Sequence, residues 1–442
     1  MNKRAHGISH ALFLKDFVML KLDEHTLENI VSPKDIAEHI AIHKEKLKKV
    51  QQGLIGAPAC LGWFNIPKDI DGYVAPFISL AEEVHKIATT MIVVGIGGSN
   101  RGSMAVLQAL HRKISSPTKV VYAGDTLSAA KLKDILHIIE NEEVVLDIIA
   151  KDFNTLEPGI TFRMLRTAIQ EKYGDKYNQR VIVTGSYGPG QLYELAQKHG
   201  YTFLEFPENI GGRFSVLTAV GLFPMAVAGV NIRRVMEGAK AAEHYVKTTE
   251  IEDNSAVRYA ISRNLLFDKG FKVESLVLFE PDLIHLGRWW VQLFAESEGK
   301  TPRALFPTSF MNSDDLHAVG QYIQEGPLWI AETFLHLFFE NKDCIIPDSS
   351  VVQDGFDYIT GKNFDHLNLS VYNAALQAHK DRGVACTQFI GKAIEPEFFG
   401  YFFYYFFFVS YVSGIILDVN PFDQNGVEGY KKNMYSILGK SK

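Results

Sequence analysis

The sequence predicts an α/β protein with two doubly wound parallel-sheet units and helical segments at both ends. Apolar strand-like runs alternate with helix-like runs, a glycine-rich turn follows the first run, and a second block after residue 230 repeats the pattern. Such alternation is typical of a parallel sheet covered by helices on both faces. The candidate strands of the first block are Ile92–Val94, Lys119–Tyr122, Val144–Ile149, Val181–Thr184 and Phe203–Phe206.

The chain divides into four predicted segments. Residues 1–60 are expected to be a helical N-terminal segment, 61–230 a first α/β domain, 231–420 a second α/β domain, and 421–442 a C-terminal loop and helix. In the second block we expect helices at 232–247, 254–267 and 282–299, with strands at 276–279 and near 304–306 and 328–331.

Composition excludes several classes of protein. The 442 residues are 47% hydrophobic and carry a net charge of −6, so we expect no nucleic-acid partner. The three cysteines are far apart and show no CxxC spacing, which favours free thiols in a reducing, cytoplasmic compartment over a disulfide or zinc framework. Lys15 and Asp16 interrupt the only apolar patch near the N-terminus, so we expect no secretion signal.

One aromatic segment has the length of a membrane span. Phe398–Leu417 contains 20 residues without a charge. It also contains tyrosines and serines, and no cluster of Lys or Arg flanks it closely. We therefore expect a buried core or subunit-interface helix, and a membrane helix is the alternative.

A glycine turn at residues 95–99 is the first candidate site. Gly97, Gly98 and Ser99 join a strand to a helix, where free amides can bind a phosphate. Asn100 stands where a dinucleotide-binding loop has its third glycine, and Asp125 lies about 30 residues on. A tight turn without a ligand is the alternative interpretation.

Three further stretches carry candidate chemistry. In "ENIGGRFSVLTAVG", Gly212 allows a ligand to approach the backbone closely, and Ser215 is a possible helix cap. Arg213 follows the end of a strand, where it either stabilises an oxyanion or forms a structural ion pair. In "WWVQLFAESEGK", Gln292 and Glu296 share one helix face.

Glu296 is the candidate general base in this second stretch because its neighbours are apolar, and Glu298 competes for the role. His317 is expected in a later helix, where a structural role is the alternative. In the third stretch, "FDQNGVEGYKKN", Gln424 lies in a loop and Lys431 lies two turns into a helix, with a surface lysine as the alternative.

Together these stretches resemble the glucose-6-phosphate isomerase family. "ENIGGRFSVLTAVG" and "GIILDVNPFDQNGVEGYK" are similar to its two signatures, "FAESEGK" to the segment around its base, and "VVGIGGSNRGS" to its first phosphate segment. The resemblance implies two sugar-isomerase (SIS) domains and a cytoplasmic homodimer. It also implies a phosphosugar substrate, no metal or redox cofactor, and no membrane.

The resemblance assigns a role to each residue. Glu296 matches the base that moves a proton between C2 and C1, and Arg213 the residue that stabilises the enediolate. His317, from the partner subunit, and Lys431 match the groups that act in ring opening. The substrate-binding residues implied are Gly97, Gly98, Ser99, Lys151, Thr155, Gly212, Gln292 and Gln424.

One stretch departs from the family pattern. The second phosphate loop of the family resembles "SKSGTTTEP" or "SKTFTTQET", whereas this chain has "AKDFNTLEP". Ala150, Asp152, Asn154 and Leu156 replace hydroxyl or small residues, while Lys151 and Thr155 remain. Lost donors predict weaker phosphate binding or a shifted substrate, unless Asp152 turns away or Asn154 donates instead. A non-catalytic sugar-phosphate sensor on the same fold is the alternative function, followed by a nicotinamide-dependent dehydrogenase.

Overall fold

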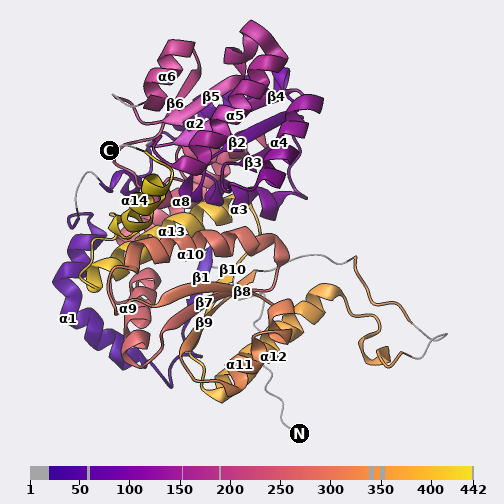
Figure 1. The fold of residues 1–442 in the computed structure, drawn as a ribbon. Coiled ribbons are helices and arrows are strands. Elements are labelled where there is room, and N and C mark those ends of the chain that lie inside the picture. The colour runs from indigo at the N-terminus through magenta and orange to yellow at the C-terminus, as the bar shows by residue number, and fades with distance from the viewer. Residues whose placement is uncertain are drawn as a thin grey trace.

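The protein folds into two lobes, each built around one five-stranded sheet (Figure 1). The computed structural model describes residues 19–56, 60–151, 153–188, 191–337, 343–348 and 354–440. The predicted α/β class with two parallel-sheet units is confirmed. Residues 343–348 and 354–363 extend away from the second lobe.

The first sheet is fully parallel and has the order β3-β2-β4-β5-β6. Its strands match the five predicted runs to within two residues at each end: β2 Thr90–Val94, β3 Lys119–Ala123, β4 Val144–Ala150, β5 Val181–Gly185 and β6 Thr202–Glu205. Both faces are apolar, because Met91 and Val93 pack into one core while Ile92 and Val94 pack into another.

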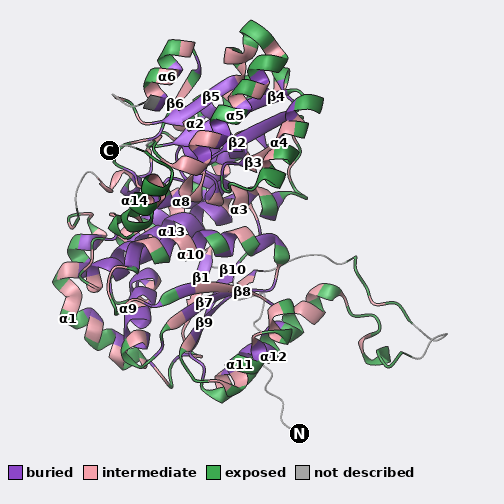
Figure 2. Cartoon of the chain, viewed as in Figure 1, coloured by how far each residue is buried: buried purple, intermediate pink, exposed green. Residues whose placement is uncertain are grey.

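Helices cover both faces of this sheet. On the side of Met91 lie α2 (Ile70–Ile87), α3 (Arg101–Leu110) and α7 (Ala219–Val227). On the other side lie α4 (Ala129–Asn141), α5 (Leu156–Tyr173) and α6 (Gln191–His199). The burial colouring in Figure 2 shows the strands buried between helices whose outer faces are exposed.

The second sheet has the order β1-β10-β9-β7-β8. The strands β7 (Val273–Leu278), β8 (Phe306–Met311), β9 (Ile330–Leu337) and β10 (Cys386–Gly391) are parallel. Helices α9 (Ser255–Asp268), α10 (Ile284–Glu298) and α13 (Pro396–Ile416) contribute to the core on one face. Helices α11 (Gly320–Glu325) and α12 (Phe364–Arg382) cover the other.

The N-terminal segment differs from its helical prediction. Leu20–Asp23 forms β1, which pairs antiparallel with β10, and α1 (Pro33–Gln51) follows it. Ser32 caps α1 by accepting from the Asp35 amide while the Asp35 carboxylate accepts from the Ser32 amide. A four-residue strand that alternates Leu and charged residues carries too little pattern to be recognised in isolation.

The three cysteines are unpaired thiols, as expected. Cys386 is buried in β10, Cys344 is exposed, and Cys60 is half-buried. Burial raises the pKa of the Cys386 thiol well above its usual value, so this thiol stays protonated at neutral pH.

The aromatic segment is a buried core helix, as predicted. α13 is long and apolar enough to cross a membrane, but its apolar window is wholly buried inside this protein. It crosses α8 (Ile232–Thr248) so closely that a Cβ on Gly400 would overlap the carbonyl oxygen of Val235. Its rings pack on α10, with Trp289 and Phe403 centroids 4.7 Å apart.

We expect Gly400→Ala to lower the free energy of unfolding by about 2 kcal/mol or more, because a methyl group there must push α8 away. Gly429→Ala in α14 (Glu428–Ile437) is the matched control, since a Cβ there meets nothing within 4 Å. Urea unfolding of both variants measures the difference. Equal stability of the two would contradict the close packing of α8 and α13.

A buried carboxyl group lies in the middle of the first sheet. Asp147 on β4 is fully buried, and its Oδ1 accepts a hydrogen bond from Thr184 Oγ1 at 3.0 Å. Its Oδ2 has no partner among the described residues. Burial raises the pKa of Asp147 to about 7, because the apolar surroundings disfavour the charged form.

The raised pKa predicts a pH-dependent stability. An unfolded Asp titrates near pH 4, so the folded state holds this proton more tightly and loses stability as the pH rises from about 4 to 7. Asp147→Asn removes that loss and should stabilise the protein at pH 8 by roughly 2–4 kcal/mol, with little effect at pH 4.5. Urea unfolding at both pH values tests this. The exposed Asp134→Asn is the control, and an equal effect of Asp147→Asn at both pH values would refute the prediction.

Candidate active site

Two glycine-rich turns meet at the carboxyl ends of β2 and β6. The turn η4 (Gly97–Ser99) leads into α3, and η6 (Gly212–Phe214) follows the β6 loop. A Cβ on Gly98 would overlap the Gly212 carbonyl oxygen, and a Cβ on Gly97 would lie 2.9 Å from Gln292 Nε2. Gly97 also has φ +61°, which favours glycine. The predicted residues Gly97, Gly98, Gly212 and Gln292 therefore lie together.

Asn100 fixes the conformation of the first turn. Its side chain is buried, and its Nδ2 donates to the Gly95 carbonyl at 3.0 Å. This bond gives the residue a structural role at the position where a dinucleotide-binding loop would have glycine. The neighbouring Ser99 is half-buried, and its hydroxyl makes no hydrogen bond to any other described residue, so it is free to bind a ligand.

Arg213 connects three distant segments of the chain. It is buried, and its Nε donates to Ser297 Oγ at 3.0 Å, next to Glu296. Its Nη2 donates to the carbonyl of Asp423 at 2.9 Å and to that of Pro421. Its Nη1 lies 3.3 Å from Glu296 Oε2. Burial lowers the pKa of Arg213, which nevertheless remains a cation at physiological pH.

The expected cap at Ser215 is wrong. Thr218 caps α7, with its hydroxyl accepting from the Val220 amide at 3.3 Å. Ser215 instead donates its hydroxyl to the Gly212 carbonyl at 2.7 Å. Ser215 therefore closes the turn that presents Arg213, and α7 begins three residues later than expected.

The two candidate carboxylates of α10 have different surroundings. Glu296 is partly exposed and accepts from Gln292 Nε2 at 2.9 Å, on the face toward the glycine turns. Glu298 is buried and pairs with Arg263 Nη2 at 2.7 Å. Arg263 is itself buried, contacts Glu274, and stacks on Phe294 at 3.8 Å. Glu298 is thus part of a structural ion cluster, and Glu296 is the carboxylate available at the site.

The second predicted phosphate loop holds its lysine in a structural contact. Lys151 Nζ donates to the carbonyls of Glu208 at 2.6 Å and Ile210 at 3.1 Å, which anchors the segment before Arg213. Burial lowers the pKa of Lys151. Asp152 lies outside the described residues. Ala150 ends β4, is buried, and has no side-chain donor because it is an alanine.

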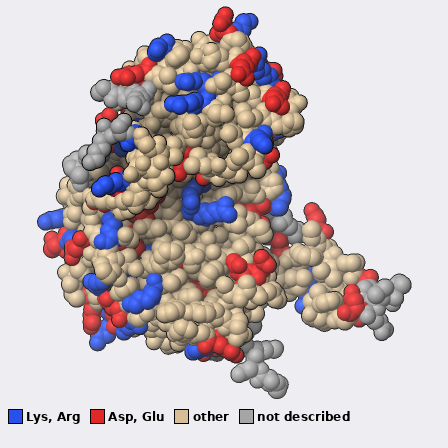
Figure 3. All heavy atoms as spheres, viewed as in Figure 1, with Lys and Arg blue, Asp and Glu red and all other residues tan. Residues whose placement is uncertain are grey.

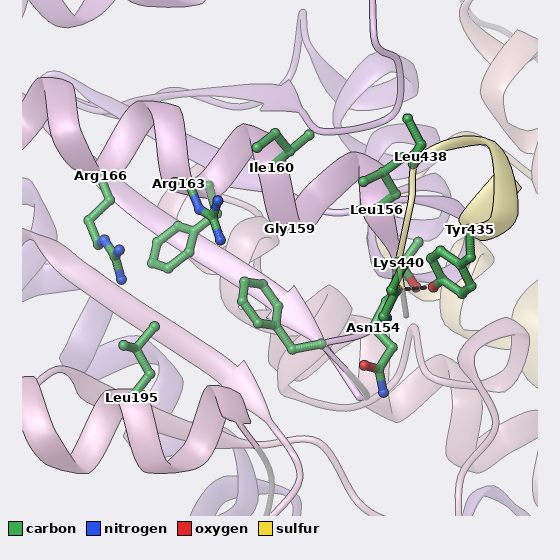
Figure 4. Close-up of a pocket in the computed structure, with 13 residues that line it drawn as sticks. Asn154, Leu156, Gly159, Ile160, Arg163, Arg166, Leu195, Tyr435, Leu438 and Lys440 are labelled. Carbon is green, nitrogen blue, oxygen red and sulfur yellow. Dashed lines mark hydrogen bonds between the residues drawn. The ribbon is translucent and has the colours of Figure 1, made fainter. Parts of the chain in front are cut away.

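Thr155 stands at the start of α5 and lines a cavity of about 550 Å³ (Figure 4). The cavity lies between α5, the loop that contains Asn154, and the end of α14. Tyr435 of α14 donates its hydroxyl to the Asn154 carbonyl at 2.6 Å. Leu156 also lines this cavity, so an apolar side chain stands where the two family patterns have Thr or Gln.

The C-terminal loop contacts Arg213 through the carbonyls of Pro421 and Asp423. Gln424 is exposed and precedes η10 (Asn425–Val427), directly after Asp423, which binds Arg213. Lys431 lies in the first turn of α14, one turn earlier than expected. Its Nζ lies 2.8 Å from Glu428 Oε1, and this hydrogen bond raises the pKa of Lys431.

His317 is separate from this cluster within one chain. It ends the 3-10 turn η8 (Asp314–His317) after β8, rather than lying in the expected helix, and its side chain is exposed. Among the described residues, no hydrogen bond or ion pair joins it to Glu296 or Arg213.

One residue of the site, Ser297, and one of the neighbouring ion cluster, Arg263, were not predicted from the sequence. Ser297 orients Arg213, and its position beside Glu296 gave no separate signal. Arg263 gave no separate signal either, because its helix also contains Arg258, Asn264 and Asp268. A buried arginine needs a carboxylate partner, which here is Glu298.

The chain is similar to known proteins over most of its length. The family profile described as phosphoglucose isomerase matches residues 80–307. A glucose-6-phosphate isomerase of Alkaliphilus metalliredigens is 42% identical over 390 residues, covering 86% of this chain and 87% of the relative. The chain belongs to the phosphoglucose isomerase family. A glucose-6-phosphate isomerase of Caldanaerobacter subterraneus is 40% identical over 393 residues, with 86% of each chain covered.

Solved structures share the fold of this phosphoglucose isomerase family member. A hypothetical protein from Thermus thermophilus aligns with a TM-score of 0.86 at 24% identity, covering 95% of this chain and 100% of that one. A glucose-6-phosphate isomerase from Chlamydia trachomatis aligns with a TM-score of 0.76 at 17% identity, covering 92% of this chain and 86% of that one.

Proposed function

We propose that this chain interconverts glucose 6-phosphate and fructose 6-phosphate. The observation that carries the proposal is the contact between Glu296, Gln292 and Arg213 against the glycine turns at Gly97 and Gly212. A carboxylate that can serve as a base, a permanent cation and free backbone amides within one site support this reaction. Family membership and the 42% identical isomerase support the same activity.

Glu296 serves as the base for both halves of the reaction. Its carboxylate takes the C2 proton of the open aldose, which leaves a cis-enediolate, and returns it at C1. The O2 hydroxyl proton moves to O1 in the same interconversion, which completes the ketose. One carboxylate can serve both carbons because they are adjacent, and Gln292 holds it in place through the 2.9 Å hydrogen bond. No net electrons leave the substrate, so the reaction requires no redox cofactor.

Arg213 stabilises the negative charge that develops on the enediolate oxygen. Its guanidinium stays protonated throughout, and its bonds to Ser297 and Asp423 orient it before substrate binds. Ser99, Thr155 and the amides of Gly97 and Gly98 bind the phosphate. Gln424 positions the sugar, and Lys431 acts on the ring oxygen during ring opening.

The functional unit in this proposal is a cytoplasmic homodimer. His317 is exposed and lies away from the Glu296 cluster, which fits a histidine that acts in ring opening at the partner's site. A symmetric dimer then contains two shared sites. The three unpaired cysteines fit the reducing cytoplasm.

We expect Glu296→Gln to lower kcat about 10³-fold, because the amide cannot accept the C2 proton, while KM for fructose 6-phosphate changes little. A coupled assay of glucose 6-phosphate formation measures both constants. The exposed Glu325→Gln, on α11, is the control and should match the parent.

A Glu296→Gln variant that keeps more than a tenth of the parent's kcat would exclude Glu296 as the base. A parent that binds fructose 6-phosphate without turnover would favour the sugar-phosphate sensor instead.

The shared site predicts complementation between inactive variants. Glu296→Gln and His317→Ala homodimers should each be inactive, and mixed subunits should regain up to about a quarter of the parent activity, since half of the dimers then contain one intact site. Activity after co-refolding of equal amounts measures this. Failure to regain activity, with mixed dimers present by native mass spectrometry, would place His317 within its own subunit's site.

A further inference from the structure

Arg101 is a half-buried cation that the mechanism above does not use. It is the first residue of α3, two positions after Ser99. Its Nη1 donates to the Arg288 carbonyl on α10 at 2.9 Å. Helix α10 also carries Gln292 and Glu296, one and two turns further along, so Arg101 lies along the face of α10 that forms the site.

The guanidinium of Arg101 has no ion-pair partner in the described part of the chain. Its hydrogen bond to the Arg288 carbonyl uses one of five N–H donors. Desolvation lowers the pKa of Arg101, and the charges of Glu296 and Asp125 oppose that shift. Arg288 adds a second, exposed cation beside it. Keeping an unpaired cation partly out of water costs free energy, which an anionic ligand would offset.

The surroundings of Arg101 place this charge near the expected phosphate position. Asp125, whose charge raises the pKa of Arg101, follows Gly124 at the end of β3. A Cβ on Gly124 would lie 3.1 Å from the Cα of Pro158 in the first turn of α5 and 3.3 Å from the Gly95 amide nitrogen. The end of β3, the first glycine turn and the start of α5 are therefore adjacent. Figure 3 shows Lys or Arg side chains gathered in the hollow between the lobes, near α3 and α10.

The loop expected to bind the phosphate offers fewer hydroxyl donors than the family pattern. Ala150 is buried at the end of β4, Leu156 lines the cavity beside α5, and Lys151 binds backbone carbonyls. Among the predicted phosphate ligands, only Ser99 and Thr155 carry hydroxyl groups. A phosphate monoester dianion is then short of partners, while an unpaired guanidinium lies at the edge of the same site.

We propose that Arg101 binds the phosphate group of the substrate in place of the missing hydroxyl donors, with Arg288 adding positive charge at the rim of the cleft. This inference rests on the proposed isomerase function for the identity of the substrate, but not for the presence of the anion site. The ligand class is a phosphate monoester. Arg101 is a binding residue for the phosphate and takes no part in proton transfer.

The test compares Arg101→Leu and Arg101→Lys with the parent. Arg101→Leu should raise KM for fructose 6-phosphate about tenfold or more, with kcat changed less than threefold. The KM of Arg101→Lys should lie between those of the parent and Arg101→Leu. Calorimetric titration with inorganic phosphate gives a second readout that needs no turnover. The affinity for phosphate should be highest in the parent, lower in Arg101→Lys and lowest in Arg101→Leu. Arg233→Leu is the control, because Arg233 is an exposed helix arginine that pairs with Asp71 at 2.8 Å.

The outcomes separate the two proposals. Loss of phosphate binding in Arg101→Leu, with no turnover in the parent, would sustain the anion site and reject the isomerase function. Phosphate binding in Arg101→Leu within twofold of the parent would overturn the inference, as would a parent that does not bind phosphate. A lower Tm in Arg101→Leu with unchanged phosphate binding would also overturn it, since that result indicates a structural role.

Discussion

The site depends on one buried guanidinium, that of Arg213. Its donors reach Ser297 on α10, the carbonyls at 421 and 423 and the carboxylate of Glu296, which belong to segments 83 to 210 residues away along the chain. A lysine could not make these contacts, because an ammonium lacks the planar fork that directs several donors at fixed angles. Orientation of Arg213 and docking of the C-terminal loop are therefore a single event, and the site is complete only when that loop is in place.

Helix α10 serves both the site and the core of the second lobe. Its face with Gln292 and Glu296 is turned toward the glycine turns of the first lobe. Glu298, two residues on, points to Arg263 and is buried with it. A helix advances about 100° per residue, so this short spacing is enough to give two carboxylates opposite environments. The buried pair also resists rotation of the helix, because rotation would separate desolvated charges.

Much of the fold could be predicted because its signals are local. The five strands of the first sheet are continuous apolar runs, and the charge-free segment of α13 indicates a buried helix. Strand β10, "CTQFIG", was missed because Thr and Gln interrupt its pattern although all six residues are buried. In the site, the motifs identified the segments that meet. They could not predict that Lys151 would bind backbone carbonyls or that Ser215 would close a turn, because such contacts depend on loops brought together by the fold.

Strand β1 has a consequence for the integrity of the second sheet. It pairs antiparallel along Gln388–Gly391 of β10, whose six residues are buried. Without β1, an apolar strand with unpaired amides and carbonyls would form the sheet margin, and such margins can template pairing with other chains. The charged Lys21 and Asp23 of β1 give the outermost strand a polar character that discourages further strand addition. The short N-terminal strand therefore protects the margin of the second sheet from pairing with strands of other chains.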